Sequence, residues 1–416
     1  MLKNYLKIAL KVLLRRKFFT FVSLFGISFT LIVLLIATAM FDHEFGPLAP
    51  ELKTDRMLGI YSVRIENQEK GYARTGASPY WFLERYVRPL TSAEKVSIYG
   101  TQRSVTSFKN GVKHSLFLKR TDGEFWEILD FKFLEGGPIS RQDEKEGNMV
   151  AVINEATRRR LFDGQSAVGK TLEADGQSFR VIGVVENVPF LRVTSFAEVW
   201  VPLSSAKTSA YRHDQAGDFL AIILAETKAD VPKIKEELQG VLPTVEIPGP
   251  TEFNRVITAA ETLFEAAARG IFANDRDAGD YSKTLFALLM LLMLLFMLLP
   301  TINLININMS RIMERAAEIG VRKAFGASSL RLVAQFLIEN LVLTFIGGAL
   351  AFVGAAILLQ LITDSGLVQY AVFTINYRVF FYGLLVALVF GLLSGVYPAW
   401  KMSRLHPVEA LRGKSI

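Results

Sequence analysis

The chain has 416 residues, of which 51% are hydrophobic and 21% charged, and its formal net charge is +7. The large apolar content, with 31 Phe and 10 Met, excludes an intrinsically disordered protein and argues against a wholly soluble enzyme. No cysteine is present, so disulfides, thiolate metal sites and cysteine nucleophiles are excluded.

Four stretches are apolar enough and long enough to cross a bilayer, which takes about 20 residues. We predict transmembrane helices at 18–41, 284–310, 332–363 and 379–400, the third with its uncharged part from Leu341. The first stretch is far longer than the roughly 7–15-residue apolar core of a cleaved signal peptide, so we expect it to stay in the protein.

The charges of the remaining segments predict the topology. Residues 1–17 and the short segments 311–331 and 401–416 are rich in Lys and Arg, which is typical of cytoplasmic segments. Both termini are then cytoplasmic, and segments 42–283 and 364–378 are extracytoplasmic. The long segment holds 31 basic and 35 acidic residues. The positive net charge therefore reflects topology and contact with membrane lipids, not binding of nucleic acid.

Local signals in the extracytoplasmic segment predict a mixed α/β domain, which we expect to have two lobes. The Asn154 side chain can cap a helix that runs to about Phe162, because its oxygen accepts from free first-turn amides. Asp175 and Gly176 supply the positive φ angles of a tight turn, so we predict a β-hairpin around them.

The end of this segment predicts a helix, because five apolar residues recur at helical spacing. These residues are Val256, Ala260, Leu263, Ala267 and Ile271. We expect the helix to start near Val256 and to continue toward the second span as a stalk.

One stretch imitates a nucleotide-binding motif. Residues 164–171 match the phosphate-loop pattern G-x-x-x-x-G-K-[ST] letter for letter. Such a loop needs a preceding strand and a following helix, so that backbone amides converge on the phosphate. Here a predicted helix precedes it and the Asp175 turn follows, so we interpret the stretch as a loop that leads into a strand.

Other catalytic and binding signatures are missing from the sequence. The four histidines have no metal-ligand spacing, and neither a nucleophile elbow nor a zinc-protease motif occurs. Residues 158–160 are three arginines on one helical turn that point in three directions, which we interpret as a solvated face. We therefore predict no catalytic residue, metal site or cofactor in this chain.

Proline, asparagine and glycine residues in the predicted spans are candidates for helix packing. Pro300 removes a backbone donor and is expected to kink the second span. Asn303 and Asn306 either form hydrogen bonds between helices of a dimer or lie where the span emerges into headgroups, and both interpretations stay open. Three glycines permit close helix approach in the third span: Gly347, Gly348 and Gly354.

The segment 315–328 predicts a short amphipathic cytoplasmic helix. Glu318 and Arg322 lie at i,i+4 and can pair, and Gly326 can end the helix as a left-handed cap. By itself such a helix is either a docking element or a surface feature. The candidate docking residues are Arg315, Glu318, Ile319, Gly320, Val321, Arg322, Lys323 and Gly326.

This segment resembles the loop between the second and third spans of MacB/FtsX-type ABC transporter permeases. In that family the pattern R-x-x-E-I-G-x-x-[RK]-A-x-G-A marks the coupling helix, which docks into the ATPase subunit. Residues 4–23 resemble the family's amphipathic entry helix and first span, which implies an amphipathic cytoplasmic helix within residues 1–17. Residues 150–154 and 181–185 resemble the family's extracytoplasmic domain, and residues 395–412 resemble its C-terminal signature. The resemblance covers nearly the whole chain.

The resemblance implies a permease of the bacterial inner membrane, with four transmembrane helices and a large periplasmic α/β domain between the first two. It implies a second permease chain, identical or different, and two copies of a cytoplasmic ATPase that binds ATP and Mg. MacB itself carries its ATPase on the same chain, whereas this sequence contains none, so we expect the ATPase on a separate polypeptide.

The resemblance also implies mechanotransmission, in which ATP hydrolysis drives conformational work outside the membrane. That work is efflux, lipoprotein release or regulation of a periplasmic partner, and an adaptor or substrate protein is a further partner that the resemblance leaves open. The alternative is a membrane-anchored sensor or binding protein without a motor. A membrane hydrolase, the third hypothesis, lacks a catalytic constellation in this sequence.

Overall fold

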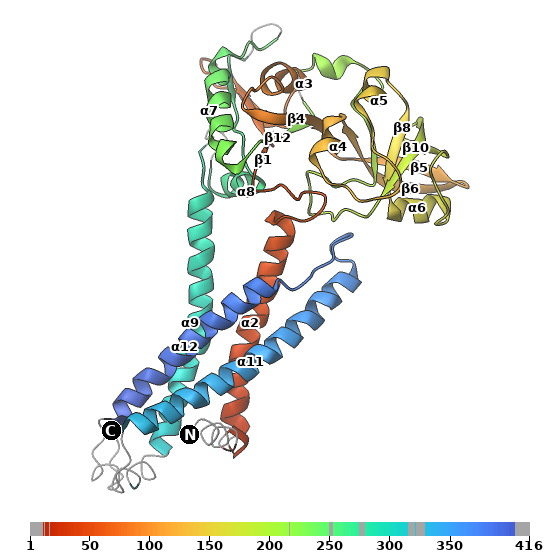
Figure 1. Ribbon diagram of the computed structural model, residues 1–416. Coiled ribbons are helices and arrows are strands. Elements are labelled where there is room, and N and C mark those ends of the chain that lie inside the picture. The colour runs from red at the N-terminus through yellow and green to blue at the C-terminus, as the bar shows by residue number, and fades with distance from the viewer. Residues whose placement is uncertain are drawn as a thin grey trace. The chain divides into compact units, whose positions relative to one another are not determined.

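The computed structural model describes most of the chain (Figure 1). The described residues are 11, 13–15, 17–215, 217–248, 253–273, 279–314, 321 and 329–403. The chain divides into two compact units. The membrane unit comprises Met1–Phe41, Phe286–Leu367 and Phe373–Ile416, and the outer unit comprises Asp42–Leu285 and Val368–Val372.

A 10-stranded mixed sheet runs through the outer unit. Its main path is, in spatial order, β1 (Met57–Ile60), β12 (Phe219–Ala225), β4 (Ala93–Gly100), β6 (Val112–Thr121), β11 (Val199–Pro202), β8 (Val150–Asn154), β10 (Gln177–Val185) and β7 (Phe133–Gly136). Strand β5 (Arg103–Lys109) pairs with β6, and β9 (Thr171–Ala174) pairs with β10. Strands β6 and β11 run parallel, as do β8 and β10, and the remaining pairs are antiparallel.

A second sheet of three strands and several short helices complete the outer unit. The sheet consists of β13 (Arg255–Ile257), β2 (Val63–Glu66) and β3 (Ala73–Gly76). The α-helices are α3 (Tyr80–Phe82), α4 (Glu124–Ile128), α5 (Arg141–Glu146), α6 (Glu155–Phe162), α7 (Val231–Val241) and α8 (Leu263–Phe272). Apolar side chains form three cores along the large sheet, the central one around Trp126 and Trp200.

The local predictions around residues 154–185 are confirmed. The Asn154 side chain accepts a hydrogen bond from the Thr157 amide at 2.8 Å and caps α6. Asp175 and Gly176 have φ angles of 54° and 68° and connect β9 to β10. The false phosphate loop lies between α6 and β9, so no helix follows it and its interpretation as a loop before a strand is correct.

The predicted helix from Val256 is wrong at its start. Val256 lies in β13 opposite Ile65 of β2, because pairing with a neighbouring strand outweighs the helical spacing. The helix α8 begins only after Thr262, whose side chain accepts from the Glu265 amide at 3.2 Å while Glu265 accepts from the Thr262 amide at 2.8 Å. It ends at Phe272, and α9 begins at Ser282, so a single stalk helix into the second span is also wrong.

Among its described residues, the membrane unit contains four long helices, at the places where the sequence predicts spans. They are α2 (Lys17–Phe45), α9 (Ser282–Glu314), α11 (Ser329–Ser365) and α12 (Tyr377–Ser403), and α11 packs along α12 (Figure 1). In the described residues, Lys17–Phe45 and Leu337–Ser365 are long and apolar enough to cross a membrane. Shorter apolar helices cover Ser282–Leu298 and Tyr377–Leu393, so the number of four spans stays a prediction.

A buried carboxylate joins neighbouring elements of the large sheet. Asp122 accepts hydrogen bonds from the Ser97 hydroxyl (2.6 Å), the Ile98 amide (2.7 Å), the Phe125 amide (3.0 Å) and Arg88 (3.1 Å). Burial raises the pKa of Asp122 to about 6, although the guanidinium and the hydrogen bonds oppose the rise. The carboxylate thus ties β4 to the start of α4.

We predict that Asp122→Ala lowers the free energy of unfolding of the outer unit by about 2–4 kcal/mol, because four donors lose a buried acceptor. Tryptophan fluorescence during chemical unfolding measures this, since Trp81, Trp126 and Trp200 all lie in the outer unit. Glu246→Ala is the control, because that carboxylate is exposed. Equal midpoints for the two variants would contradict the prediction.

Candidate functional site

The predicted coupling helix lies almost entirely outside the described residues. Of its eight candidate docking residues only Val321 is described, in helical conformation and with 43% of its side chain exposed. The roles assigned to these eight residues therefore stay predictions.

The predicted packing glycines of the third span lie on α11 against two other helices. At two of them a side chain of α2, and at the third a side chain of α12, occupies the place of an added Cβ, so a larger residue would require a neighbour to shift. An added Cβ would lie 2.7 Å from Ile27 at Gly347, 2.6 Å from Leu384 at Gly348 and 2.7 Å from Ile32 at Gly354. Small residues at such points allow the close contact that drives helix association in a bilayer.

The other three packing candidates lie on α9. Asn306 is exposed in the single chain, while for Pro300 and Asn303 only the place within the helix is described. Both interpretations of the asparagines, a dimer contact and an exit into headgroups, stay predictions.

Buried polar side chains line the inner face of α11. Gln335 donates to Glu339 at 3.2 Å, and Asn340 donates to the Gly391 carbonyl of α12 at 3.4 Å. Ser28 of α2 donates to the Gly347 carbonyl at 3.1 Å. Lipid offers no hydrogen-bond partner, so ionisable and amide groups within a membrane face the interior of the helix bundle.

We predict that Gly347→Ala lowers the stability of the membrane unit by about 1–3 kcal/mol, since the added methyl group overlaps Ile27. Gly383→Ala is the matched control, because its Cβ would lie 3.4 Å from Leu34, an ordinary contact. Thermal unfolding of the detergent-solubilised variants measures the difference. The prediction fails if Gly347→Ala melts at the same temperature as Gly383→Ala.

The outer unit contains an irregular loop that is largely buried. This β10–β11 loop, residues 186–198, includes Arg192, whose side chain is 0% exposed. Arg192 donates to the Gly46 carbonyl at 2.7 Å and pairs with Glu51 at 3.3 Å. Ser195 donates to Glu51 through its hydroxyl at 2.6 Å. The segment that follows α2 is thus fixed to this loop by buried polar contacts.

A buried lysine supports the same loop from β6. Lys119 is 1% exposed, and its ammonium group donates to the carbonyls of Val193 (2.8 Å) and Thr194 (2.6 Å). It also lies 5.2 Å from the ring centre of Tyr99. Burial lowers the pKa of Lys119 to about 7, and the nearby Glu51 only partly opposes this.

The lowered pKa predicts a pH-dependent stability. Between pH 7 and the ordinary lysine pKa of 10.5, the unfolded chain binds a proton that the folded chain does not, so stability rises with pH in this window. We expect Lys119→Met to remove about 2–3 kcal/mol of the rise between about pH 7.5 and about pH 9.5. Chemical unfolding at both pH values measures it, with Lys113→Met as control. A rise that Lys119→Met leaves unchanged would contradict the assignment.

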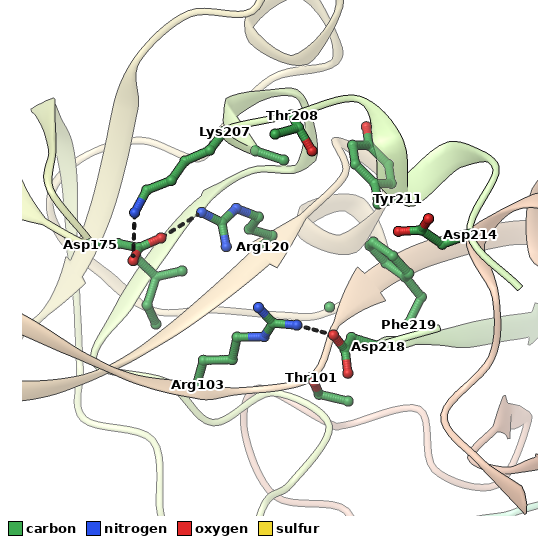
Figure 2. Close-up of a pocket in the computed structure, with 13 residues that line it drawn as sticks. Thr101, Arg103, Arg120, Asp175, Lys207, Thr208, Tyr211, Asp214, Asp218 and Phe219 are labelled. Carbon is green, nitrogen blue, oxygen red and sulfur yellow. Dashed lines mark hydrogen bonds and ion pairs between the residues drawn. The ribbon is translucent and has the colours of Figure 1, made fainter. Parts of the chain in front are cut away.

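A charged cleft of about 280 Å³ opens on the outer unit. Figure 2 shows Lys207 and Arg120 converging on Asp175, each at 3.1 Å, and Arg103 paired with Asp218. Burial alone would raise the pKa of Asp175, but hydrogen bonds from Lys207 and Arg120 lower it. These charged groups neutralise one another, and their ion pairs link segments that lie far apart in sequence.

The three arginines of α6 are only partly solvated. They point in three directions, as predicted, but Arg158 pairs with Glu135 at 2.6 Å and Arg160 with Glu198 at 3.2 Å. The prediction of a solvated face is therefore wrong for Arg158 and Arg160. Their acidic partners lie on a strand and a loop, and the sequence of the helix alone does not show which residues lie beside it. Among the described residues, no group of three or more His, Cys, Asp or Glu could hold a metal ion.

Taken together, the apolar helices and the α/β outer unit define a membrane protein with a large extramembrane domain. Residues 20–241 match the MacB-like periplasmic core domain, and residues 290–407 match the FtsX-like permease C-terminal domain. Since the first match alone covers more than half of the chain, the chain belongs to the ABC transporter permeases with MacB-like and FtsX-like domains. The resemblance found in the sequence is confirmed.

The relatives are permeases and larger fusion proteins. The uncharacterised ABC transporter permease YknZ of Bacillus subtilis is 27% identical over 326 residues, which cover 76% of this chain and 76% of that protein. The macrolide export ATP-binding/permease protein MacB of Bdellovibrio bacteriovorus is 29% identical over 281 residues, which cover 66% of this chain but only 40% of that protein. The extracellular domain of a YknZ transporter from Gram-positive bacteria covers 48% of this chain and 98% of its own, with 16% identity and a TM-score of 0.37.

Proposed function

We propose that the chain is the permease subunit of an ABC transporter that works by mechanotransmission. A separate cytoplasmic ATPase, present in two copies, would bind ATP and Mg and hydrolyse the nucleotide. Two permease chains, identical or different, would transmit its motion to the periplasmic side. The observation that carries the proposal is the order of the two family matches, a periplasmic core domain at 20–241 followed by a permease domain at 290–407.

The segment 315–328 would be the contact with the ATPase. Its sequence fits the coupling-helix pattern of the family at every fixed position. Glu318 and Arg322 would pair or hydrogen-bond in the ATPase groove, and Ile319 and Val321 would pack there. A charge-assisted contact at this point also fixes orientation, which a motion-transmitting joint requires.

The proposed orientation follows from the basic residues beside the spans. Short segments rich in Lys and Arg stay in the cytoplasm, which places both termini and the 311–331 loop on the side where ATP is available. The outer unit then lies in the periplasm of an inner-membrane protein. Efflux, lipoprotein release and regulation of a periplasmic partner are the kinds of work that this arrangement would support.

We predict that Glu318→Lys lowers permease-stimulated ATP turnover by about tenfold or more, because it places a repelling charge in the ATPase groove. The variant should still insert and purify like the unaltered protein. Glu314→Lys is the matched control, since it makes the same charge change at the end of α9, close to the motif but outside it. Normal coupled turnover in Glu318→Lys would overturn the assignment of the coupling helix.

Purification of the tagged chain from its native membrane tests the proposal as a whole. An ATPase recovered in equal amount supports it, and a second permease chain recovered with it identifies the pair. A preparation that contains no ATPase, even after cross-linking in gentle detergent, would favour a membrane-anchored sensor instead.

A further inference from the structure

The connection between α11 and α12 does not belong wholly to the membrane unit. Its residues Val368–Val372 are part of the outer unit, although the chain on either side of them returns to the membrane unit. The sequence predicts only a short loop at 364–378. Five residues between two apolar helices are therefore held by an α/β domain that lies elsewhere in the sequence.

The polar contacts of these residues converge on one buried carboxylate. Glu198, which is 2% exposed, lies at the end of the β10–β11 loop. Its Oε1 accepts from the Tyr370 hydroxyl at 2.7 Å, from Arg160 at 3.2 Å and from Gln369 at 3.4 Å. Its Oε2 accepts from the Phe117 amide of β6 at 3.0 Å. Both carboxylate oxygens are thus used.

Backbone and aromatic contacts add to this carboxylate. The Phe190 amide donates to the Gln369 carbonyl at 3.0 Å, so loop and connection share a main-chain hydrogen bond. The Tyr370 ring lies 6.5 Å from the ring of Phe196 and packs against the central core. Tyr370 also has a φ of +59°, a conformation that is unfavourable for a side chain of this size and that persists only where surrounding contacts impose it.

The same loop also holds the segment after α2. Arg192 and Ser195 fix Gly46 and Glu51, as described above. Glu198, which follows them in the same loop, fixes Tyr370. Two chain segments that lead directly into long apolar helices therefore meet on the β10–β11 loop. Strands β10 and β11 carry that loop directly into the large sheet.

We propose that Glu198 and the β10–β11 loop form a fixed joint that holds the α11–α12 connection on the outer unit. Through this joint, movement of α11 and α12 would reach the large sheet. The transmission step rests on the proposed transporter function, whereas the joint itself does not. A fixed joint fits better than a transient contact, because release would leave a buried carboxylate without two of its donors.

The joint is tested by cross-linking, for which the cysteine-free chain is a clean background. Residues joined by a backbone hydrogen bond lie near the range of about 4.4–6.8 Å between Cα atoms that a disulfide spans. In the full-length chain in membrane vesicles, Phe190→Cys with Gln369→Cys should lose its free thiols on mild oxidation. Gln369→Cys with Lys233→Cys, on the distant helix α7, should keep them. Leu191→Cys can replace Phe190→Cys if loss of the ring disturbs the core.

Removing one hydroxyl then tests the role of Glu198. Tyr370→Phe in the cross-linking background should lower the equilibrium constant for the closed joint about tenfold, the effect expected when a hydrogen bond to a buried carboxylate is lost. Disulfide formation should therefore fail at a lower denaturant concentration in this variant than in the parent pair. Tyr72→Phe, a change at an exposed tyrosine of the outer unit, should have no effect. Cross-linking of the parent pair no faster than of the Lys233 control pair, or an unchanged denaturant dependence in Tyr370→Phe, would overturn the joint.

Transmission needs the complex with the ATPase. A single cysteine at Val193, which is exposed on the β10–β11 loop, reports loop movement through its rate of thiol labelling. We expect ATP to change that rate, and Tyr370→Phe but not Tyr72→Phe to reduce the change at least about threefold. A response that Tyr370→Phe leaves intact would refute transmission. A cross-linked joint in a protein that recruits no ATPase would refute the transporter function while the joint stands.

Discussion

A guanidinium without access to solvent has to find its partners inside the protein, because arginine cannot shed its charge by deprotonation. Arg192 is such a group, and its partners are the Gly46 carbonyl and the Glu51 carboxylate. Separating Arg192 from Glu51 would leave a buried guanidinium and a buried carboxylate unpaired, at a cost of several kcal/mol. The position of the chain after α2 is therefore dictated by a loop almost 150 residues further along.

The conformation of that loop depends on several strands at once. A buried loop has backbone groups that no regular ladder satisfies, so side chains from other elements must supply the partners. Lys119 from β6 binds two of its carbonyls, and the Phe117 amide of the same strand binds Glu198. Because these partners come from β6, the conformation of the loop depends on the large sheet as well as on hydrogen bonds within the loop. A satisfied polar network of this kind favours a single conformation over alternative ones.

Sequence reasoning succeeded where the determining interaction is local. Asn154 caps its helix through an amide three residues away, and Asp175 and Gly176 make a turn by their own backbone preferences. The family motifs likewise carry their meaning within a short stretch. The contact between Glu198 and Tyr370 spans 172 residues, and neither side chain has a local signature. Val256 shows the same limit of sequence reasoning. Its helical spacing predicts a helix, but it pairs with a strand that is far away in sequence.

Different kinds of interaction stabilise the interior of each unit. The difference matters for how force would pass along the chain. In the membrane unit, α11 contacts α2 and α12 at glycines, where association depends on close packing, which has little directional preference. In the outer unit, the connection between α11 and α12 is held by hydrogen bonds from Tyr370 and Gln369 to a carboxylate, which fix both position and orientation. Helices that associate by shape alone can shift past one another in small steps. Movement of α11 and α12 can act on the large sheet only if their connection stays firmly attached to the outer unit. On the proposed mechanism, the buried polar contacts of the β10–β11 loop would supply that resistance, which also explains why a tyrosine is kept there in an unfavourable backbone conformation.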